Sequence, residues 1–218
     1  MSAKTAATFD HLVVAADTLE EGEDFLEARF GVRPRRGGKH VAMGTHNSLM
    51  RLGPREYIEV IAIDPDGAKP DRPRWFDLDR PFMRALLQQQ PRLVHWAARV
   101  DDIDAAVAAC PVDLGTPQSM TRAGLHWRIT IPGDGQRPGA GVAPALIQWG
   151  DEHHPGDSLP DTGVRVAAIA AAHPEPDKMR AAIGGHVALA ARYGHLVAAR
   201  LRSRLCPRTR LRPTPLAH

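Results

Sequence analysis

Two stretches of this chain carry the same pattern of apolar and polar positions. Residues 9–19 and 93–103 each contain an apolar, strand-like run, followed by an Asp and then by the start of a helical pattern. A histidine opens the run in both stretches, His11 in the first and His95 in the second. Such repetition predicts two copies of one supersecondary unit. A histidine at the same point of each copy indicates a functional site where the copies meet.

The first copy predicts a strand, a helix and then three more strands. The opening strand covers residues 8–16, and Asp17 or Thr18 can cap a helix that reaches about Arg29. Gly31 supplies the stop after that helix. The later strands are predicted at Lys39–Met43, Ser48–Leu52 and Tyr57–Ile63, with turns at residues 44–47 and 53–55.

The second copy repeats this order of elements. Its strand, helix and three strands are predicted at residues 93–100, 102–109, 118–121, 125–131 and 143–149. A short helix at about residues 81–90 precedes it, and a strand at 164–171 with a helix over 178–183 follows. From about residue 200 the sequence mixes Arg with Pro and offers no apolar face to bury.

These patterns predict an α+β fold in five parts. The parts are a first βαβββ module at residues 1–64, a connector at 65–92, a second βαβββ module at 93–155, a partial third βα unit at 156–199, and an Arg/Pro-rich tail at 200–218 that we expect to be disordered.

The positive charge of the chain is concentrated at its C-terminal end. Lys and Arg number 28 against 25 Asp and Glu, which gives a formal net charge of +3. Seven Arg and no acidic residue lie between Ala188 and His218, so the rest of the chain is slightly acidic by count. Aromatic residues are not interleaved with the tail arginines, as they would be in a single-stranded nucleic-acid site. We therefore expect no nucleic-acid partner.

The sequence also argues against a membrane or an exported location. No apolar run approaches the roughly 18 residues of a spanning helix, and the first residues lack the apolar core of a signal peptide. The two cysteines, Cys110 and Cys206, are far apart and fit a reducing compartment. We expect a cytoplasmic protein without a membrane partner.

A carboxylate interrupts the last strand of the first copy. Glu59 lies within the run Tyr57–Ile61, and Gln148 holds the corresponding place in the second copy. Two histidines and a carboxylate suit Zn, Fe, Mn, Ni or Co. We therefore predict that His11, Glu59 and His95 bind a divalent metal, against the alternative that the histidines are satisfied core residues. Gln148 is expected to bind the metal weakly or to contact a water or substrate.

Several segments resemble motifs of one known family. They are Phe9–Val13, Gly37–His40, Met43–Leu49, Tyr57–Glu59, His95–Ala97 and Pro144–Trp149. Together they are similar to the glyoxalase-like branch of the vicinal oxygen chelate superfamily, and the resemblance covers about residues 8–175.

The resemblance implies paired βαβββ modules that form an incomplete barrel around a divalent metal. His11 would face Glu59 and His95 would face Gln148. The metal would stabilise an enolate or an activated oxygen adduct. Two departures stand out: Gln148 replaces a Glu that many metal-dependent members carry, and the C-terminal region turns Arg- and Pro-rich.

Four more side chains are predicted to bind substrate with Gln148. His46 and Asn47 lie in a predicted turn beside the first-module strands, and Arg122 and Trp127 flank a strand of the second module. The guanidinium of Arg122 suits a carboxylate or carbonyl, against the alternative of a surface arginine. For Trp127 the alternative is a place in the core.

Three functions remain open at this point. The first is a divalent-metal enzyme, a lyase, isomerase or dioxygenase, that acts on a small oxygenated organic substrate. The second is a metal-free protein of the same fold that binds or sequesters a small molecule. The third is an interaction protein that works through its arginine tail. The expected partner is a small molecule, and a homodimer is left open.

Overall fold

A computed structural model describes residues 7–150, 153–183, 187–191, 196–202 and 209–211. The elements of the first module are β1 (Thr8–Ala15), α1 (Leu19–Phe30), β2 (Arg35–His40), β3 (Thr45–Gly53) and β4 (Glu56–Ile63). The next are α2 (Pro81–Leu87), β5 (Arg92–Arg99), α3 (Ile103–Ala109), β6 (Thr116–Arg122), β7 (Leu125–Ile131) and β8 (Ala145–Trp149). The last are α4 (Pro155–Ser158), β9 (Arg165–His173), α5 (Pro176–Ile183), β10 (Val187–Ala191), β11 (Leu196–Arg202) and β12 (Thr209–Leu211).

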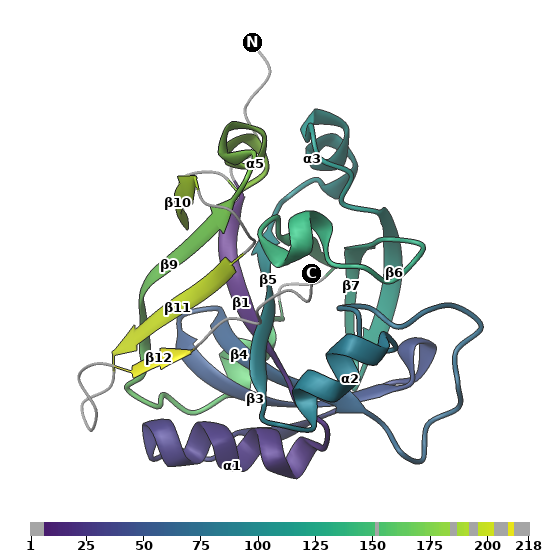
Figure 1. Cartoon of the computed structure of the whole chain (residues 1–218). Helices are drawn as coiled ribbons and strands as arrows, with labels where there is room; N and C mark the ends of the chain where they lie inside the picture. Colours follow the sequence, from purple (N-terminus) through teal and green to yellow (C-terminus); the bar gives the residue numbers. More distant parts are fainter. Residues whose placement is uncertain (1–6, 151–152, 184–186, 192–195, 203–208, 212–218) are drawn as a thin grey trace.

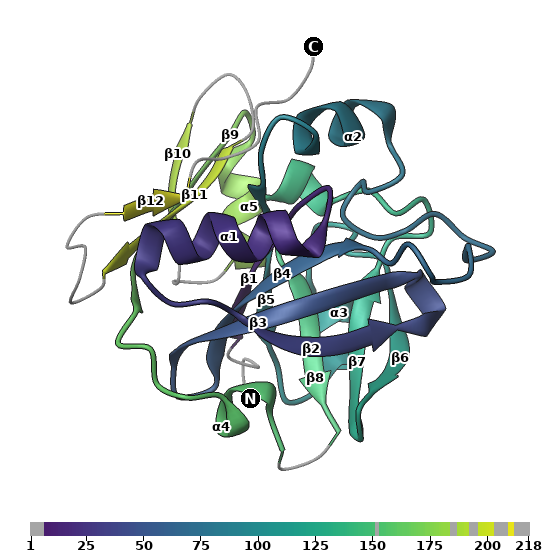
Figure 2. The same cartoon turned by 90° about the horizontal axis from the view of Figure 1, so that it is seen from below.

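The two modules share one curled sheet of eight strands. Its order is β2-β3-β4-β1-β5-β8-β7-β6, so the two halves mirror each other about the β1–β5 pair. Within each half the first and last strands pair in parallel, β1 with β4 and β5 with β8. The curl brings the edge strands β2 and β6 into contact (Figure 2). The predicted α+β fold of paired βαβββ modules in an incomplete barrel is confirmed.

Strand alternation gives this sheet two apolar faces. On β1, Leu12 and Val14 pack outward against α1 and the C-terminal elements, whereas Val13 and Ala15 face the inside of the curl. Successive side chains of a strand point to opposite faces, so neighbouring residues join different clusters. The inner cluster also contains Trp75 and other residues that follow β4. The site described below lies on this inner face.

Helix α1 covers the outer face beside β3 and β4 (Figures 1 and 2). Thr18 accepts from the Glu21 N–H while the Glu21 carboxylate accepts from the Thr18 N–H, which forms a capping box at the start of the helix. Gly31 ends it in the left-handed conformation, as predicted. Between these ends, Leu26 and Phe30 are fully buried and attach the helix to the sheet.

The C-terminal part forms a second sheet of order β10-β9-β11-β12. Its β9-α5-β10 segment is the predicted third βα unit, with β9 and β10 parallel. The expectation of disorder from residue 200 is wrong for residues 200–202 and 209–211, which are strands. Leu201 and Leu211 alternate with arginines and are buried against the outer face, so this stretch does offer an apolar edge. The expected tail segments 203–208 and 212–218 lie outside the described residues.

One predicted turn is also placed differently. Residues 45–47 belong to β3, where Thr45 pairs with Ile63 and Asn47 with Ile61. The turn is instead a short 3₁₀ segment at Val41–Met43, closed by Gly44 in the left-handed conformation. Pairing with β4 therefore overrides the turn preference of Gly and Asn in this stretch. In the part of the chain that the structure describes, no helix is long and apolar enough to cross a membrane.

Candidate active site

The inner face of the sheet holds a narrow cleft that opens to solvent. It encloses about 330 Å³ of unfilled space, a volume that includes its open mouth. Its lining combines titratable groups with aromatic and aliphatic walls. The lining residues are His11, His40, Tyr57, Glu59, Trp75, Phe76, Arg122, Trp127, Ile129, Ile147 and Trp149.

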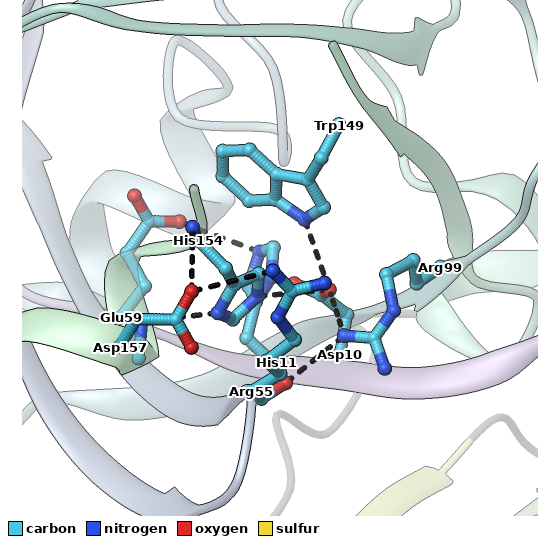
Figure 3. A network of polar contacts seen from close by, with 9 residues as sticks. Asp10, His11, Arg55, Glu59, Arg99, Trp149, His154 and Asp157 are labelled. Carbon is cyan, nitrogen blue, oxygen red and sulfur yellow. Dashed lines mark hydrogen bonds and ion pairs between the residues drawn. The ribbon is translucent and has the colours of Figure 1, made fainter. Parts of the chain in front are cut away.

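His11 enters this cleft from β1 and is held by the residue before it. The pairing of β1 with β5 shifts register between Phe9 and His11, which is a β-bulge at Asp10. Neighbours on a regular strand point to opposite faces, but here His11 Nδ1 lies 2.7 Å from Asp10 Oδ1 (Figure 3). The Tyr57 ring stacks on the imidazole at 4.5 Å between centroids. The imidazole is therefore fixed from two sides.

Asp10 is fully buried and collects hydrogen bonds on both oxygens. Its Oδ2 accepts from Arg99 at 3.1 Å, from the Trp149 indole at 3.1 Å and from His154 at 3.2 Å (Figure 3). Burial alone would raise the pKa of this carboxyl, but the hydrogen bonds from His11 and His154 outweigh burial and hold the pKa well below its usual value. Asp10 is thus a carboxylate at neutral pH.

The hydrogen bonds assign the proton positions on both histidines. His154 Nδ1 accepts from the Gly156 N–H at 3.0 Å, so its Nε2 carries the hydrogen that Asp10 accepts. His11 donates its Nδ1 hydrogen to the same carboxylate. In neutral His11 the Nε2 atom therefore carries the lone pair, and this atom faces Glu59 in the cleft.

Glu59 approaches the same point from β4. Its Oε2 lies 3.9 Å from His11 Nε2, and its Oε1 accepts from Asn47 Nδ2 at 2.5 Å. The Asn47 amide is oriented in turn by the Gly38 N–H, which donates to Oδ1 at 3.1 Å. The backbone of β2 therefore fixes one oxygen of Glu59 through Asn47 and leaves the other toward His11.

His40 and Arg122 join the edge strands β2 and β6. Arg122 Nη1 lies 3.0 Å from His40 Nε2, and His40 Nδ1 lies 3.2 Å from Thr45 Oγ1. A guanidinium only donates, so Nε2 is the acceptor and Nδ1 carries the hydrogen. Burial and the Arg122 charge hold the pKa of His40 well below its usual value, which keeps the ring neutral.

The predicted site residues separate into three groups. His11, Glu59, Arg122 and Trp127 line the cleft, and Asn47 lies behind Glu59. His95 lines a neighbouring cavity, with the Phe76 ring 5.2 Å from its own. Whether these residues bind metal or substrate stays a prediction, as does any such role for His46 and Gln148, which lie elsewhere.

Gln148 faces the opposite side of β8 from the cleft. Its Oε1 accepts from the Ile103 N–H at 3.0 Å, at the start of α3, while Ile147 and Trp149 line the cleft. The equivalence of Gln148 with Glu59 is therefore wrong. Val13, two residues after His11, pairs with Glu59, whereas Ala97, two residues after His95, pairs with Ala145, so Ala145 holds the corresponding place. Gln148 lies three residues further along, and an odd shift turns a side chain to the other face. His46 likewise alternates with Thr45 and Asn47, and it lies near the outer-face charges of Asp64 and Arg36.

His95 is buried away from the His11–Glu59 point. Burial and the nearby Arg137 lower the pKa of His95 to about 3, so the ring is neutral at physiological pH. Its ring hydrogen-bonds to the Gly141 backbone, whereas Nδ1 has no partner among the described residues. The two repeated histidines therefore share a face of the sheet but line separate cavities.

Three polar residues of the site were not predicted from the sequence. Asp10 directly precedes His11 within the Phe9–Val13 motif, but regular alternation would send it to the outer face, and the motif gave it no role. His154 reaches Asp10 across 144 positions of sequence. His40 lies in a motif that supports the family resemblance, and that motif was the one available signal for its role.

The described residues do not form a complete metal site in the cleft. His11 and Glu59 offer two donors to one point, but no group of three His, Cys, Asp or Glu suited to a metal occurs in the described ranges. Catalytic zinc sites use three protein ligands. The His40 Nε2 lone pair is taken by Arg122, whose charge also opposes a cation nearby. The donor set thus does not fit the divalent metal that the resemblance implies.

Comparisons with known proteins match most of the chain. A family model for a glyoxalase-like domain matches residues 9–187. A hypothetical protein from Staphylococcus aureus has a similar structure, with a TM-score of 0.55 and 14% identity over 95% of this chain and 86% of that one. Methylmalonyl-CoA epimerase from Mycobacterium tuberculosis gives a TM-score of 0.43 and 16% identity over 68% and 91% of the two chains. No curated protein matches by sequence.

Proposed function

Because the chain belongs to the glyoxalase-like domain family, we propose that it is an enzyme that moves a proton on a small oxygenated organic molecule, as an isomerase or a lyase does. A fold hosts many activities, so the proposal depends on the site. The observation that carries it is the Asp10–His11 pair, which presents a histidine lone pair to Glu59 inside the cleft.

The two groups divide the proton transfer between them. His11 Nε2 accepts a proton from an acidic C–H or O–H bond of the bound molecule, and the bonding electrons stay on that molecule as an anion. Asp10 stabilises the imidazolium that forms. Glu59 Oε2, 3.9 Å from Nε2, can take up this proton from the imidazolium and then return it to another atom of the molecule. Return at a different atom is an isomerisation, and loss of a leaving group from the anion is an elimination.

The walls of the cleft favour this chemistry. Trp75, Phe76 and Trp127 border the His11–Glu59 point with apolar surface. A low-dielectric surrounding strengthens the interaction of the anion with nearby donors and with Arg122. It also limits exchange of the proton with water.

Exchange of carbon-bound hydrogen in D₂O tests the proposal directly. Pyruvate and hydroxyacetone serve as probes, and proton NMR follows loss of the hydrogens next to the carbonyl. We expect the protein to accelerate exchange and His11→Gln to lower the rate at least about 100-fold, the usual contribution of a general base. His126→Gln, which changes an exposed histidine on β7, is the matched control. Retention of more than half of the rate in His11→Gln contradicts the proposal.

Metal retention is measured on the same preparation. After incubation with Zn, Fe, Mn, Ni or Co and desalting, we expect less than about 0.1 equivalent to remain, because two donors make a weak site. One retained equivalent that is lost in Glu59→Gln would instead favour the metal-dependent lyase, isomerase or dioxygenase that the sequence suggests.

A second candidate is a metal-free binding protein. The four tryptophan and phenylalanine rings of the cleft, at Trp75, Phe76, Trp127 and Trp149, favour binding of an aromatic compound. Tight binding that His11→Gln leaves unchanged, together with no acceleration of exchange, would support this function over catalysis. A cytoplasmic location and a homodimer stay predictions of the sequence.

A further inference from the structure

Arg122 is a buried cation without a carboxylate partner in the described part of the chain. The residue is 8% exposed, yet its guanidinium takes part in none of the ion pairs found among the described residues. Its Nη1 donates to neutral His40, and its Nε has no partner there. A buried charge without an ion-pair partner is unfavourable. The site is therefore poised to accept an anion.

The guanidinium is held in place although its charge is not neutralised. His40 fixes one nitrogen, and the Trp127 ring centre lies 5.8 Å from the guanidinium carbon. Gly38 on β2 lies so close that an added Cβ would stand 3.0 Å from Arg122 Cγ. The absence of a side chain at Gly38 makes room for the arginine stem. Arg122 is therefore positioned before any ligand arrives.

Arg122 also lines a second and larger cavity, which we name the seam groove. It follows the contact between β2 and β6 and encloses about 980 Å³ including its open side. Its lining residues are Arg36, Gly37, Leu49, Arg122, Ala123, Leu125, His153, His154, Pro155, Asp157, Ser158 and Leu159. The seam groove thus meets the cleft at Arg122.

The other charges of the seam groove already have partners. Arg36 forms ion pairs with Glu20 at 2.5 Å and Glu23 at 2.7 Å, and Asp157 pairs with Arg55 at 3.4 Å. Arg122 is the guanidinium of this groove that lacks such a pair among the described residues. The guanidinium without an ion pair therefore lies where the seam groove meets the cleft that His11 and Glu59 line.

We propose that the molecule bound here is an organic carboxylate whose carboxylate group is held by Arg122 at the junction of the cleft and the seam groove. This inference names the substrate class and rests on the proposed function. One negative charge balances one guanidinium, Arg122 lines both cavities, and its Nε has no partner among the described residues. The aromatic cleft walls suit the organic part of the molecule better than they suit inorganic phosphate.

Binding of non-reacting probes tests this assignment apart from catalysis. The probes are benzoate, its neutral isostere benzamide, and inorganic phosphate, and tryptophan fluorescence of the whole chain reports binding. We expect benzoate to bind at least about tenfold more tightly than benzamide or phosphate, a difference of about 1.4 kcal/mol. Equal binding of benzoate and benzamide, tighter binding of phosphate, or no binding of benzoate would each overturn the proposal.

Variants then assign the preference to Arg122. Arg122→Gln should abolish the preference for benzoate, whereas Arg36→Gln, which removes a paired charge from the same groove, should change benzoate binding less than about threefold. Arg122→Lys keeps the charge without the fork and should retain part of the preference. Benzoate should also raise the melting temperature of the wild type but not of Arg122→Gln. An unchanged preference in both Arg122 variants would overturn the assignment.

These outcomes separate the two proposals. Benzoate binding through Arg122 without any exchange of pyruvate hydrogens would leave the carboxylate site intact and reject proton transfer by His11. Exchange without a preference for carboxylates would reject the carboxylate site and leave the proton transfer standing.

Discussion

The Asp10 carboxylate decides what His11 can do. Oδ1 fixes the Nδ1 hydrogen of His11, while Oδ2 accepts from Arg99, Trp149 and His154. Because the carboxylate is buried and held by these donors, the imidazole has one orientation and one tautomer. The position of the lone pair at Nε2 is thus set by a residue that does not line the cleft.

Asp10→Asn is expected to lower the exchange rate by about 100-fold or more with little change in substrate affinity. Three donors surround Oδ2, so the amide oxygen of Asn would occupy that place and the NH₂ would face His11. The imidazole would then carry its hydrogen on Nε2 and lose its lone pair in the cleft. Measurements of kcat and KM for pyruvate exchange check this.

Asp104→Asn serves as the control for that change. Asp104 is exposed and pairs with Arg128 on the surface, so the exchange rate should stay within twofold of wild type, as is usual for surface substitutions. A rate in Asp10→Asn that equals the rate of the control would mean that the tautomer of His11 does not limit catalysis.

The sequence predicted part of this residue-scale picture. The repeat and the carboxylate in an apolar run led to His11 and Glu59, which face each other across the cleft. Asp10 and His154 could not be found in this way. The bulge at Asp10 arises from the pairing of β1 with β5. The contact of His154 with Asp10 arises because the segment after β8 folds back beside β1. No local sequence pattern encodes either arrangement.

Among the elements, α1 shows how tightly this fold is packed. Gly22 sits in the helix where it crosses β4, and an added Cβ would stand 2.2 Å from Val60 Cγ1 and 3.0 Å from Ala16 Cβ. Ser48 on β3 also donates to Glu23 at 2.5 Å, which ties the same helix turn to the sheet. The helix therefore lies as close to the sheet as backbone and small side chains permit.

Gly22→Ala is expected to destabilise the protein by about 1 kcal/mol, although Ala favours helix. The gain in helix propensity is about 1 kcal/mol, whereas overpacking against Val60 costs roughly 1–3 kcal/mol. Urea unfolding followed by circular dichroism measures the difference. The double variant Gly22→Ala/Val60→Ala removes the clash, so it should show a favourable coupling of about 1 kcal/mol. Additive effects of the two changes would contradict the close packing.

Element order was easier to predict than register. The alternation of strands, helices and turn signals placed most elements of both modules within a few residues of their bounds. Register depends on which strand lies beside which, and an error by an odd number of positions reverses the face. Gln148 was aligned with Glu59, but the pairing of β5 with β8 places Ala145 there, and Gln148 accepts from the start of α3.

At the scale of the whole molecule, two neutral histidines are enclosed by the curled sheet. His40 joins the edge strands β2 and β6, and His95 lies beneath Phe76 near Arg137. Both have lowered pKa values, mainly because burial disfavours the charged ring. The curl of the sheet, and not the local sequence, creates this burial.

Stability should therefore fall as the pH drops from about 6.5 toward 4.5. The unfolded chain binds protons at these histidines in this range and the native state does not, so the free energy of unfolding decreases by roughly 1 kcal/mol per pH unit for each histidine. The lowered pKa of Asp10 acts in the same direction but only below about pH 4. Urea midpoints between pH 4.5 and 7.5 measure the slope.

His95→Gln should reduce that slope, because it removes one of the two buried groups. His126→Gln, at an exposed position, is the control and should leave the slope unchanged. Equal slopes in the wild type and in His95→Gln would show that His95 does not stay neutral in the native state.

The sequence by itself indicated the family through its motifs. It also determined the doubled βαβββ plan and the face on which His11 and Glu59 lie, because period-two alternation and the repeat are properties of local order. Tertiary structure decided the rest. Three features depend on contacts between distant segments. They are the bulge at Asp10, the packing of Phe76 against His95, and the contact of β2 with β6 through His40 and Arg122. Such contacts arise from the curl and pairing of strands, which a linear pattern leaves open.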